Sequence, residues 1–157
     1  MKSIKRSRIV VVADSDQGRV LTARLRRMEV AEVTAVAALE EARQLCQSGR
    51  ADACLVAIGD PVPDCAPTPE GEAPGRAYGI PALMVAPVVT PYVRRAARRF
   101  GYLAAVSAAT PPRMLYRRLG AALQHRGAAR RRSRHPTFGA PLPRPENAPV
   151  FDKPTLH

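Results

Sequence analysis

The chain has 157 residues and a mass of 17.0 kDa, enough for one domain of ordinary size. Hydrophobic residues make up 46%, aromatic residues only 4%, and the net charge is +12. The three cysteines show no CxxC or His-paired spacing, and the apolar run after the basic N-terminus covers only residues 9–13. The composition therefore argues against a disulfide framework, a metal site, a signal peptide and a membrane span, and we expect a cytoplasmic protein without a cofactor.

The chain opens with one strand-like and one helix-like segment. Residues 9–13 are apolar and mostly β-branched, which is typical of a strand buried on both faces. The run Asp14-Ser15-Asp16 predicts a helix cap. The helix that follows, over about 17–28, is expected to turn one face inward, formed by Val20, Leu21, Leu25 and Met28.

The same alternation continues up to residue 58. We expect a short strand over 33–37, a helix over 38–48 ended by Gly49, and a third strand over 53–58 with Cys54 as a small buried hydrophobe. The helix should point inward through Leu39, Ala42, Leu45 and Cys46.

Residues 61–74 interrupt this pattern. The segment holds five prolines and Gly71, so it cannot form a long helix. We expect either partly uncovered sheet on this side, which could serve as an interaction surface, or a loop packed over the gap.

Regular patterns resume at a fourth strand over 81–86. Thr90 and Pro91 then begin a helix that runs through Tyr92, Val93, Ala96, Ala97 and Phe100 to Gly101. A fifth strand covers 103–106. A last helix begins at 110–112, with an apolar face of Met114, Leu115, Leu119, Ala122 and Leu123.

Three regions follow from these patterns. Residues 1–7 form a basic N-terminal arm, residues 8–125 form the domain, and residues 126–157 form an Arg/Pro-rich, disordered tail. Five alternations of strand and helix with short connections predict an α/β fold with a five-stranded parallel sheet and helices on both faces.

Three strand segments and the C-terminal part carry a resemblance to a known family. Residues 8–16 (RIVVVADSD), 52–61 (DACLVAIGDP) and 80–87 (IPALMVAP) resemble the first, third and fourth strands of response regulator receiver domains, and residues 101–123 align with the last strand and helix. The resemblance covers about residues 7–125. It implies a flavodoxin-like (βα)5 fold whose third helix is here reduced or replaced by the proline-rich loop.

The resemblance also implies that the phosphorylation chemistry is lost. Receivers use a carboxylate nucleophile, an acidic pair that holds Mg²⁺, a hydroxyl residue and a lysine. In this chain Ala57 occupies the nucleophile position, and Ala13-Asp14 occupies the position of the acidic pair. Ala86 occupies the hydroxyl position and Ala108 the lysine position. Because alanine has neither charge nor lone pair, we expect a degenerate pseudo-receiver.

No other residue pattern predicts an enzyme. Asp60 is the nearest carboxylate after Ala57. Three residues of extended chain span roughly 10 Å, so an extended strand end places Asp60 too far away to replace the nucleophile. The chain has no phosphate-binding glycine-rich loop, and its histidines (His125, His135, His157) lie at or beyond the end of the predicted domain.

Positive charge gathers in the second half of the chain. Between Ala73 and Pro145 there are fourteen arginines and no Asp or Glu. On the helix over 91–101 and on the last helix, arginines recur at i, i+4, as in Arg94, Arg95, Arg98, Arg99, Arg113, Arg117 and Arg118. The tail adds Arg126, Arg130, Arg131, Arg132 and Arg134.

Two functions fit this charge distribution. In the first, the two basic helices, the fourth and fifth of a receiver, bind an acidic protein surface in signalling or transcription, independently of phosphorylation. In the second, the arginine-rich face and tail bind DNA or RNA without sequence specificity. The first is favoured, because the chain has no helix-turn-helix or RNA-recognition signature and few aromatic residues for base stacking. A homodimer stays open, and no membrane contact is expected.

Overall fold

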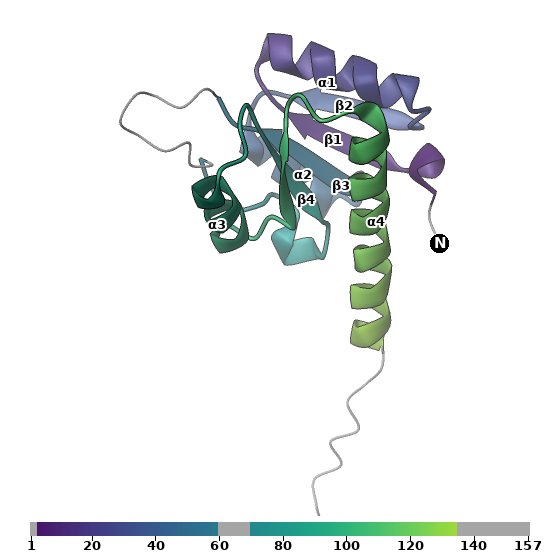
Figure 1. Ribbon diagram of the computed structural model, residues 1–157. Coiled ribbons are helices and arrows are strands. Elements are labelled where there is room, and N and C mark those ends of the chain that lie inside the picture. The colour runs from purple at the N-terminus through teal and green to yellow at the C-terminus, as the bar shows by residue number, and fades with distance from the viewer. Residues whose placement is uncertain (1–2, 60–69, 135–157) are drawn as a thin grey trace, which may run out of the picture.

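The computed structural model describes residues 3–59 and 70–134, with side chains up to Arg126 (Figure 1). Its centre is a parallel sheet with the strand order β2-β1-β3-β4-β5. The strands are β1 (Arg8–Val12), β2 (Glu32–Val36), β3 (Ala53–Ala57), β4 (Ala82–Ala86) and β5 (Ala104–Ser107). The predicted α/β fold with five parallel strands is confirmed.

Four α-helices accompany the sheet in the described part of the chain. They are α1 (Ser15–Arg27), α2 (Leu39–Gln47), α3 (Pro91–Arg99) and α4 (Pro112–Arg134). Helices α1 and α4 cover one face of the sheet, and α2 and α3 cover the other. No helix within residues 3–59 and 70–134 is both long enough and apolar enough to cross a membrane.

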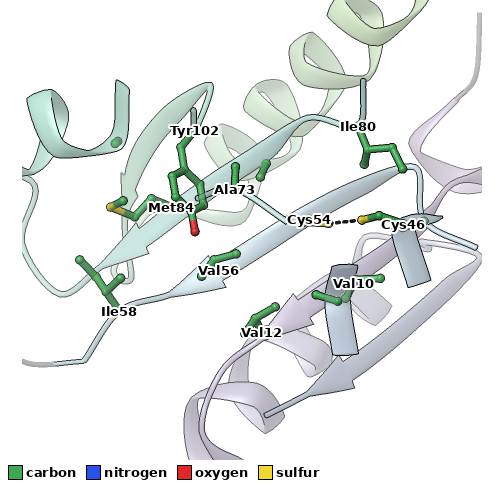
Figure 2. Close-up of a cluster of buried hydrophobic side chains, with 14 of the residues drawn as sticks. Val10, Val12, Cys46, Cys54, Val56, Ile58, Ala73, Ile80, Met84 and Tyr102 are labelled. Atoms are coloured by element: carbon green, nitrogen blue, oxygen red, sulfur yellow. Dashed lines mark hydrogen bonds between the residues drawn. The ribbon is translucent and has the colours of Figure 1, made fainter. Parts of the chain in front are cut away.

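The alternation of side chains along β1 explains the two hydrophobic layers. Ile9 and Val11 belong to the cluster under α1 and α4, whereas Val10 and Val12 belong to the cluster under α2 (Figure 2). A strand that is buried on both faces has apolar residues at every position, as the sequence of β1 does.

The residues at the centre of each apolar helix face are buried, whereas some residues at the margins are exposed. Buried residues include Leu21 and Leu25 of α1, Ala42 and Cys46 of α2, Val93 and Ala97 of α3, and Leu115 and Leu119 of α4. Two side chains that we placed on inward faces, Val20 (53%) and Met114 (44%), are exposed, as is Tyr92 (48%) of α3. Each directly precedes a buried residue. Because successive residues of a helix are rotated by about 100° about its axis, each of these residues points away from the core.

Between β3 and β4 the described chain contains only a short 3-10 helix, η2 (Arg76–Tyr78). Ala73 and Ile80 fill the hydrophobic layer on this side together with Tyr102. Figure 2 shows Tyr102 next to Met84 in this layer. The sheet is thus covered here by irregular chain, which agrees with a reduced third helix. The proline-rich residues 60–69 lie outside the described part.

Two cysteines of this layer are in contact. The Sγ atoms of Cys46 and Cys54 lie 3.5 Å apart (Figure 2), and both thiols are buried and free. Contact with Cys46 and burial both raise the pKa of Cys54, so this thiol stays protonated. The prediction of Cys54 as a small buried hydrophobe is confirmed, whereas Cys65 lies outside the described residues.

The predicted N-terminal arm over residues 1–7 is wrong for residues 3–7. These residues include the 3-10 helix η1 (Ile4–Arg6), and Ile4 is buried against α4 at Gly120. Lys5 forms an ion pair with Glu29 after α1. Burial of the apolar surface of Ile4 attaches this otherwise basic segment to the domain.

The predicted start of the tail at residue 126 is also wrong. Helix α4 continues to Arg134, and in Figure 1 its C-terminal end extends beyond the sheet. Residues 126–134 consist largely of arginine and alanine, which favour helices, and the next proline is Pro136. Residues 135–157 lie outside the described chain.

Arg126 is part of the packed domain rather than of a tail. Its Nη1 donates to Asp52 Oδ1 at 2.7 Å and to the carbonyl oxygen of Ala51 at 3.2 Å. Asp52 is 2% exposed and also accepts from the backbone N–H of Arg8 at 2.9 Å. This carboxylate therefore connects the starts of β1 and β3 with α4.

Replacing Arg126 by glutamine should lower the free energy of unfolding by about 2 kcal/mol. Breaking a buried ion pair costs ~3–5 kcal/mol, and the loss is smaller here because Asp52 keeps its bonds to Arg8. Urea denaturation of the full chain measures the difference. Arg117→Gln on the exposed side of α4 serves as the matched control and should change stability by less than about 0.5 kcal/mol. Equal effects of both substitutions would contradict a structural role for Arg126.

Candidate functional site

The carboxyl edge of the sheet brings three alanines together. Ala57 and Ala86 end β3 and β4, and Ala108 follows β5. All three line one pocket of about 60 Å³, and the rest of its lining is apolar except for Gln17. The structure thus places the residues at the expected nucleophile, hydroxyl and lysine positions side by side. Their methyl groups surround a space large enough for one or two water molecules, which we call the alanine pocket.

The remaining acidic residue of this edge has a structural partner. Asp14 is the N-cap of α1, and its Oδ1 accepts from the backbone N–H of Gln17 at 2.8 Å. It lies on the groove between α1 and β2, not among the residues that line the alanine pocket. Ala13, directly before Asp14, is buried. In the described part of the chain no group of three or more His, Cys, Asp or Glu residues is arranged to hold a metal ion.

An arginine from α1 reaches the loop after β5. Arg24 Nη1 donates to the carbonyl oxygen of Ala108 at 2.5 Å. This bond joins α1 to the loop that begins α4, close to the alanine pocket. The guanidinium of Arg24 therefore holds this loop through the backbone carbonyl group of Ala108.

The second half of the fold carries a basic surface, formed by α3, β5 and α4, that we call the basic face. Its central feature is a groove of about 610 Å³ along β5. Arg94 and Arg98 of α3 and Arg118 of α4 line the groove, together with the apolar residues Val89, Leu103 and Met114. Three of the seven arginines predicted to bind a partner therefore meet at one concave site.

The other four predicted arginines lie around this groove. Arg95 and Arg99 line a smaller hollow of about 320 Å³ on α3 with Tyr92 and Phe100, whereas Arg113 and Arg117 are exposed on α4. The i, i+4 pattern identified the charged rows correctly, but it could not tell which row borders the groove. That assignment depends on the rotation of each helix about its axis, which buried residues such as Val93 and Leu115 determine.

The arginines of the basic face have no acidic neighbours in the described part of the chain. The ion pairs found there involve Lys5, Arg8, Arg43, Arg76 and Arg126. None of the seven arginines on α3 and α4 lies within 4.0 Å of a carboxylate oxygen among these residues. Like charges one helical turn apart repel by a few tenths of a kcal/mol, so an acidic ligand would relieve this repulsion.

Four of the predicted tail arginines lie on the last turns of α4. The helical backbone includes Arg130, Arg131, Arg132 and Arg134, and the structure describes no side chains for them. Their predicted contact with an acidic partner or nucleic acid stays a prediction. The guanidinium of Arg126, for which the same contact was predicted, is bound to Asp52 within the domain.

The sequence did not predict the groove. Its floor consists of residues 103–107, three of which are small: Ala104, Ala105 and Ser107. A strand of such residues beside two arginine-bearing helices was visible in the sequence. What the sequence did not show is that β5 ends the sheet with an uncovered edge.

Several solved structures with a similar fold are receiver domains. The receiver domain protein from Methanospirillum hungatei shares 17% identity at a TM-score of 0.54, covering 79% of this chain and 98% of that one. Chemotaxis protein CheY4 from Vibrio cholerae shares 17% at 0.56, covering 74% and 98%. The receiver domain of a modulated diguanylate cyclase from Desulfovibrio desulfuricans shares 14% at 0.58, covering 79% and 98%.

These likenesses show a flavodoxin-like receiver fold over most of the chain, which confirms the expected fold. No protein-family model matches the sequence, and the search of curated proteins gave no match.

The unpaired arginines predict an unusual response to salt. Raising NaCl from ~20 to ~200 mM should increase the free energy of unfolding by about 0.5 kcal/mol, because it screens repulsion across the basic face. Urea denaturation at several salt concentrations measures this. The increase should shrink in the variant Arg94→Gln/Arg98→Gln/Arg118→Gln. A fall in stability with salt would show that attractive ion pairs outweigh the repulsion.

Proposed function

We propose that the protein is a pseudo-receiver that acts as an adaptor in signalling or transcription regulation, in the cytoplasm and without phosphorylation. Its basic face binds an acidic surface of a protein partner. The observation that carries this proposal is the groove along β5, where Arg94, Arg98 and Arg118 converge without a carboxylate among the described residues. Arginine suits such a site because its planar guanidinium makes paired hydrogen bonds to a carboxylate.

The alanine pocket supports the non-catalytic part of the proposal. Phosphoryl transfer to a receiver needs a nucleophile and groups that neutralise charge on the phosphoryl oxygens. Ala57, Ala86 and Ala108 offer methyl groups at the positions where the resemblance places these functions. Asp14 satisfies the first turn of α1 instead.

A second candidate function is binding of nucleic acid. It is favoured by one observation: α4 continues past the sheet to Arg134 and carries four arginines in its last five residues. An arginine-rich helix can follow a phosphate backbone, with strong salt dependence. The groove favours a protein partner, because three exposed or half-exposed apolar residues, Val89, Leu103 and Met114, lie among its arginines.

Replacing Arg94, Arg98 and Arg118 together by glutamine should reduce capture of protein partners from native lysate by about tenfold, because charge-assisted contacts are lost. Quantitative mass spectrometry after affinity capture with the full chain measures this. The control Arg19→Gln/Arg26→Gln/Arg27→Gln removes the same charge from exposed positions on α1 and should retain the partners. Loss of all partners after nuclease treatment would contradict the adaptor and favour nucleic acid.

Incubation with acetyl phosphate and Mg²⁺ should leave the mass of the intact protein unchanged, because the pocket holds no carboxylate nucleophile. Intact-mass spectrometry checks this, with a functional receiver domain as the positive control. Addition of a phosphoryl group that hydroxylamine removes would reveal an aspartyl phosphate. It would contradict the assignment of the nucleophile position to Ala57.

A further inference from the structure

The edge strand β5 forms the floor of the arginine-lined groove. All residues from 103 to 107 line it, although α3 and α4 pack against the two faces of the strand, so the groove follows the outer edge of β5. β5 is also the last strand of the sheet, so one of its two sides has no neighbouring strand. The groove is therefore an open strand edge between two basic helices.

The backbone of β5 has hydrogen-bonding groups available on this open side. The N–H of Leu103 donates to the carbonyl oxygen of Ala82 at 2.9 Å, toward β4. In a parallel pair, successive residues direct these groups to opposite sides of the strand. Ala104 and Val106 consequently direct their N–H and C=O groups toward the groove, where the neighbouring side chains Ala105 and Ser107 are small.

The edge lacks the features that usually prevent an additional strand from pairing. Edge strands are commonly protected by charged side chains, proline or a bulge. β5 has the sequence AAVS and a continuous register with β4 from Ala104 to Ser107. The charges lie beside it, on the helices, and all of those that line the groove are positive.

The spacing of the arginines fits an extended chain. Arg94 and Arg98 are one helical turn apart, a rise of about 6 Å. In a strand, side chains on one face recur every two residues, or about 6.7 Å. Carboxylates at alternate positions of an added strand would thus lie at nearly the same interval as the two guanidinium groups.

We propose that the basic face binds an extended acidic peptide segment of its partner, which pairs with β5 as a sixth strand and places carboxylates at alternate positions against Arg94 and Arg98. Arg118 lies on the other wall with Met114, which contacts the residues between the acids. This inference rests on the proposed function and specifies the form of the partner. Backbone bonds supply affinity and the arginines supply selectivity.

Neither a second copy nor another segment of this chain suits the groove. A second copy paired through β5 would bring its own Arg94, Arg98 and Arg118 against the first set, and like charges at close range disfavour that complex. Within the chain, acidic residues at alternate positions occur only at Asp14/Asp16 and Glu70/Glu72. Asp14 caps α1 and Glu72 pairs with Arg76, and the two acidic residues after Ala73 are six positions apart. Charge complementarity therefore favours a separate acidic partner.

A labelled synthetic peptide of about eight residues with alternating glutamate and valine tests the inference. Fluorescence anisotropy with the full chain at ~50 mM salt should show saturable binding. Arg94→Gln/Arg98→Gln should weaken it by at least about tenfold. The matched control Arg26→Gln/Arg27→Gln removes the same charge from exposed positions on α1 and should weaken it by less than about threefold.

Two further measurements separate strand pairing from simple charge attraction. N-methylation of alternate backbone amides in the peptide should abolish binding in one of the two possible registers and spare it in the other, because only one set of amides faces β5. Ala104→Pro removes an N–H on the open edge, a position where proline is tolerated, and should weaken binding by at least about tenfold. Circular dichroism checks that this variant remains folded.

Several outcomes overturn the inference. If both N-methylated peptides bind as well as the parent peptide while Arg94→Gln/Arg98→Gln still weakens binding, the site selects acidic charge without strand pairing, and the proposed function stands alone. No binding at ~100 µM peptide overturns the inference itself. If a DNA duplex binds more tightly than the peptide with the same arginine dependence, the proposed protein adaptor fails as well.

Discussion

The arrangement of the domain depends on one buried carboxylate. Asp52 lies at the start of β3, on the amino side of the sheet, with an exposure of 2%. Burying a charge costs several kcal/mol unless charged or polar groups compensate it. Arg8 and Arg126 do so from β1 and α4. Because these bonds are directional, they restrict the position of α4 along the sheet, and α4 provides the wall of the groove that carries Met114 and Arg118.

The two ends of the sheet thus have different roles. At the amino side, charged groups are buried and paired around Asp52. At the carboxyl side, where parallel α/β folds usually bind ligands, Ala57, Ala86 and Ala108 leave a pocket of only about 60 Å³. The lining of this pocket offers no carboxylate, hydroxyl or lysine to a phosphoryl group. A larger groove, of about 610 Å³, lies along the side of the sheet at β5.

Most of the fold could be predicted from the sequence because its signals are local. Every residue of β1 is compatible with burial on both faces, and Thr90 with Pro91 marks the start of α3. The Asp52–Arg126 pair could not be predicted, since 74 residues separate its members and neither belongs to a motif. Similarly, the arginine rows were visible, but their relation to the groove depends on tertiary contacts of Val93 and Leu115.

The two edges of the sheet explain why binding should favour one side. β2 forms the opposite edge, begins with Glu32 and borders a groove in which Asp14 accompanies Arg19 and Arg26. Both signs of charge are present there, so an acidic chain meets attraction and repulsion together. The groove at β5 is lined by arginines alone among charged residues. Long-range attraction should therefore direct an acidic partner to β5, where the open backbone edge can hold it.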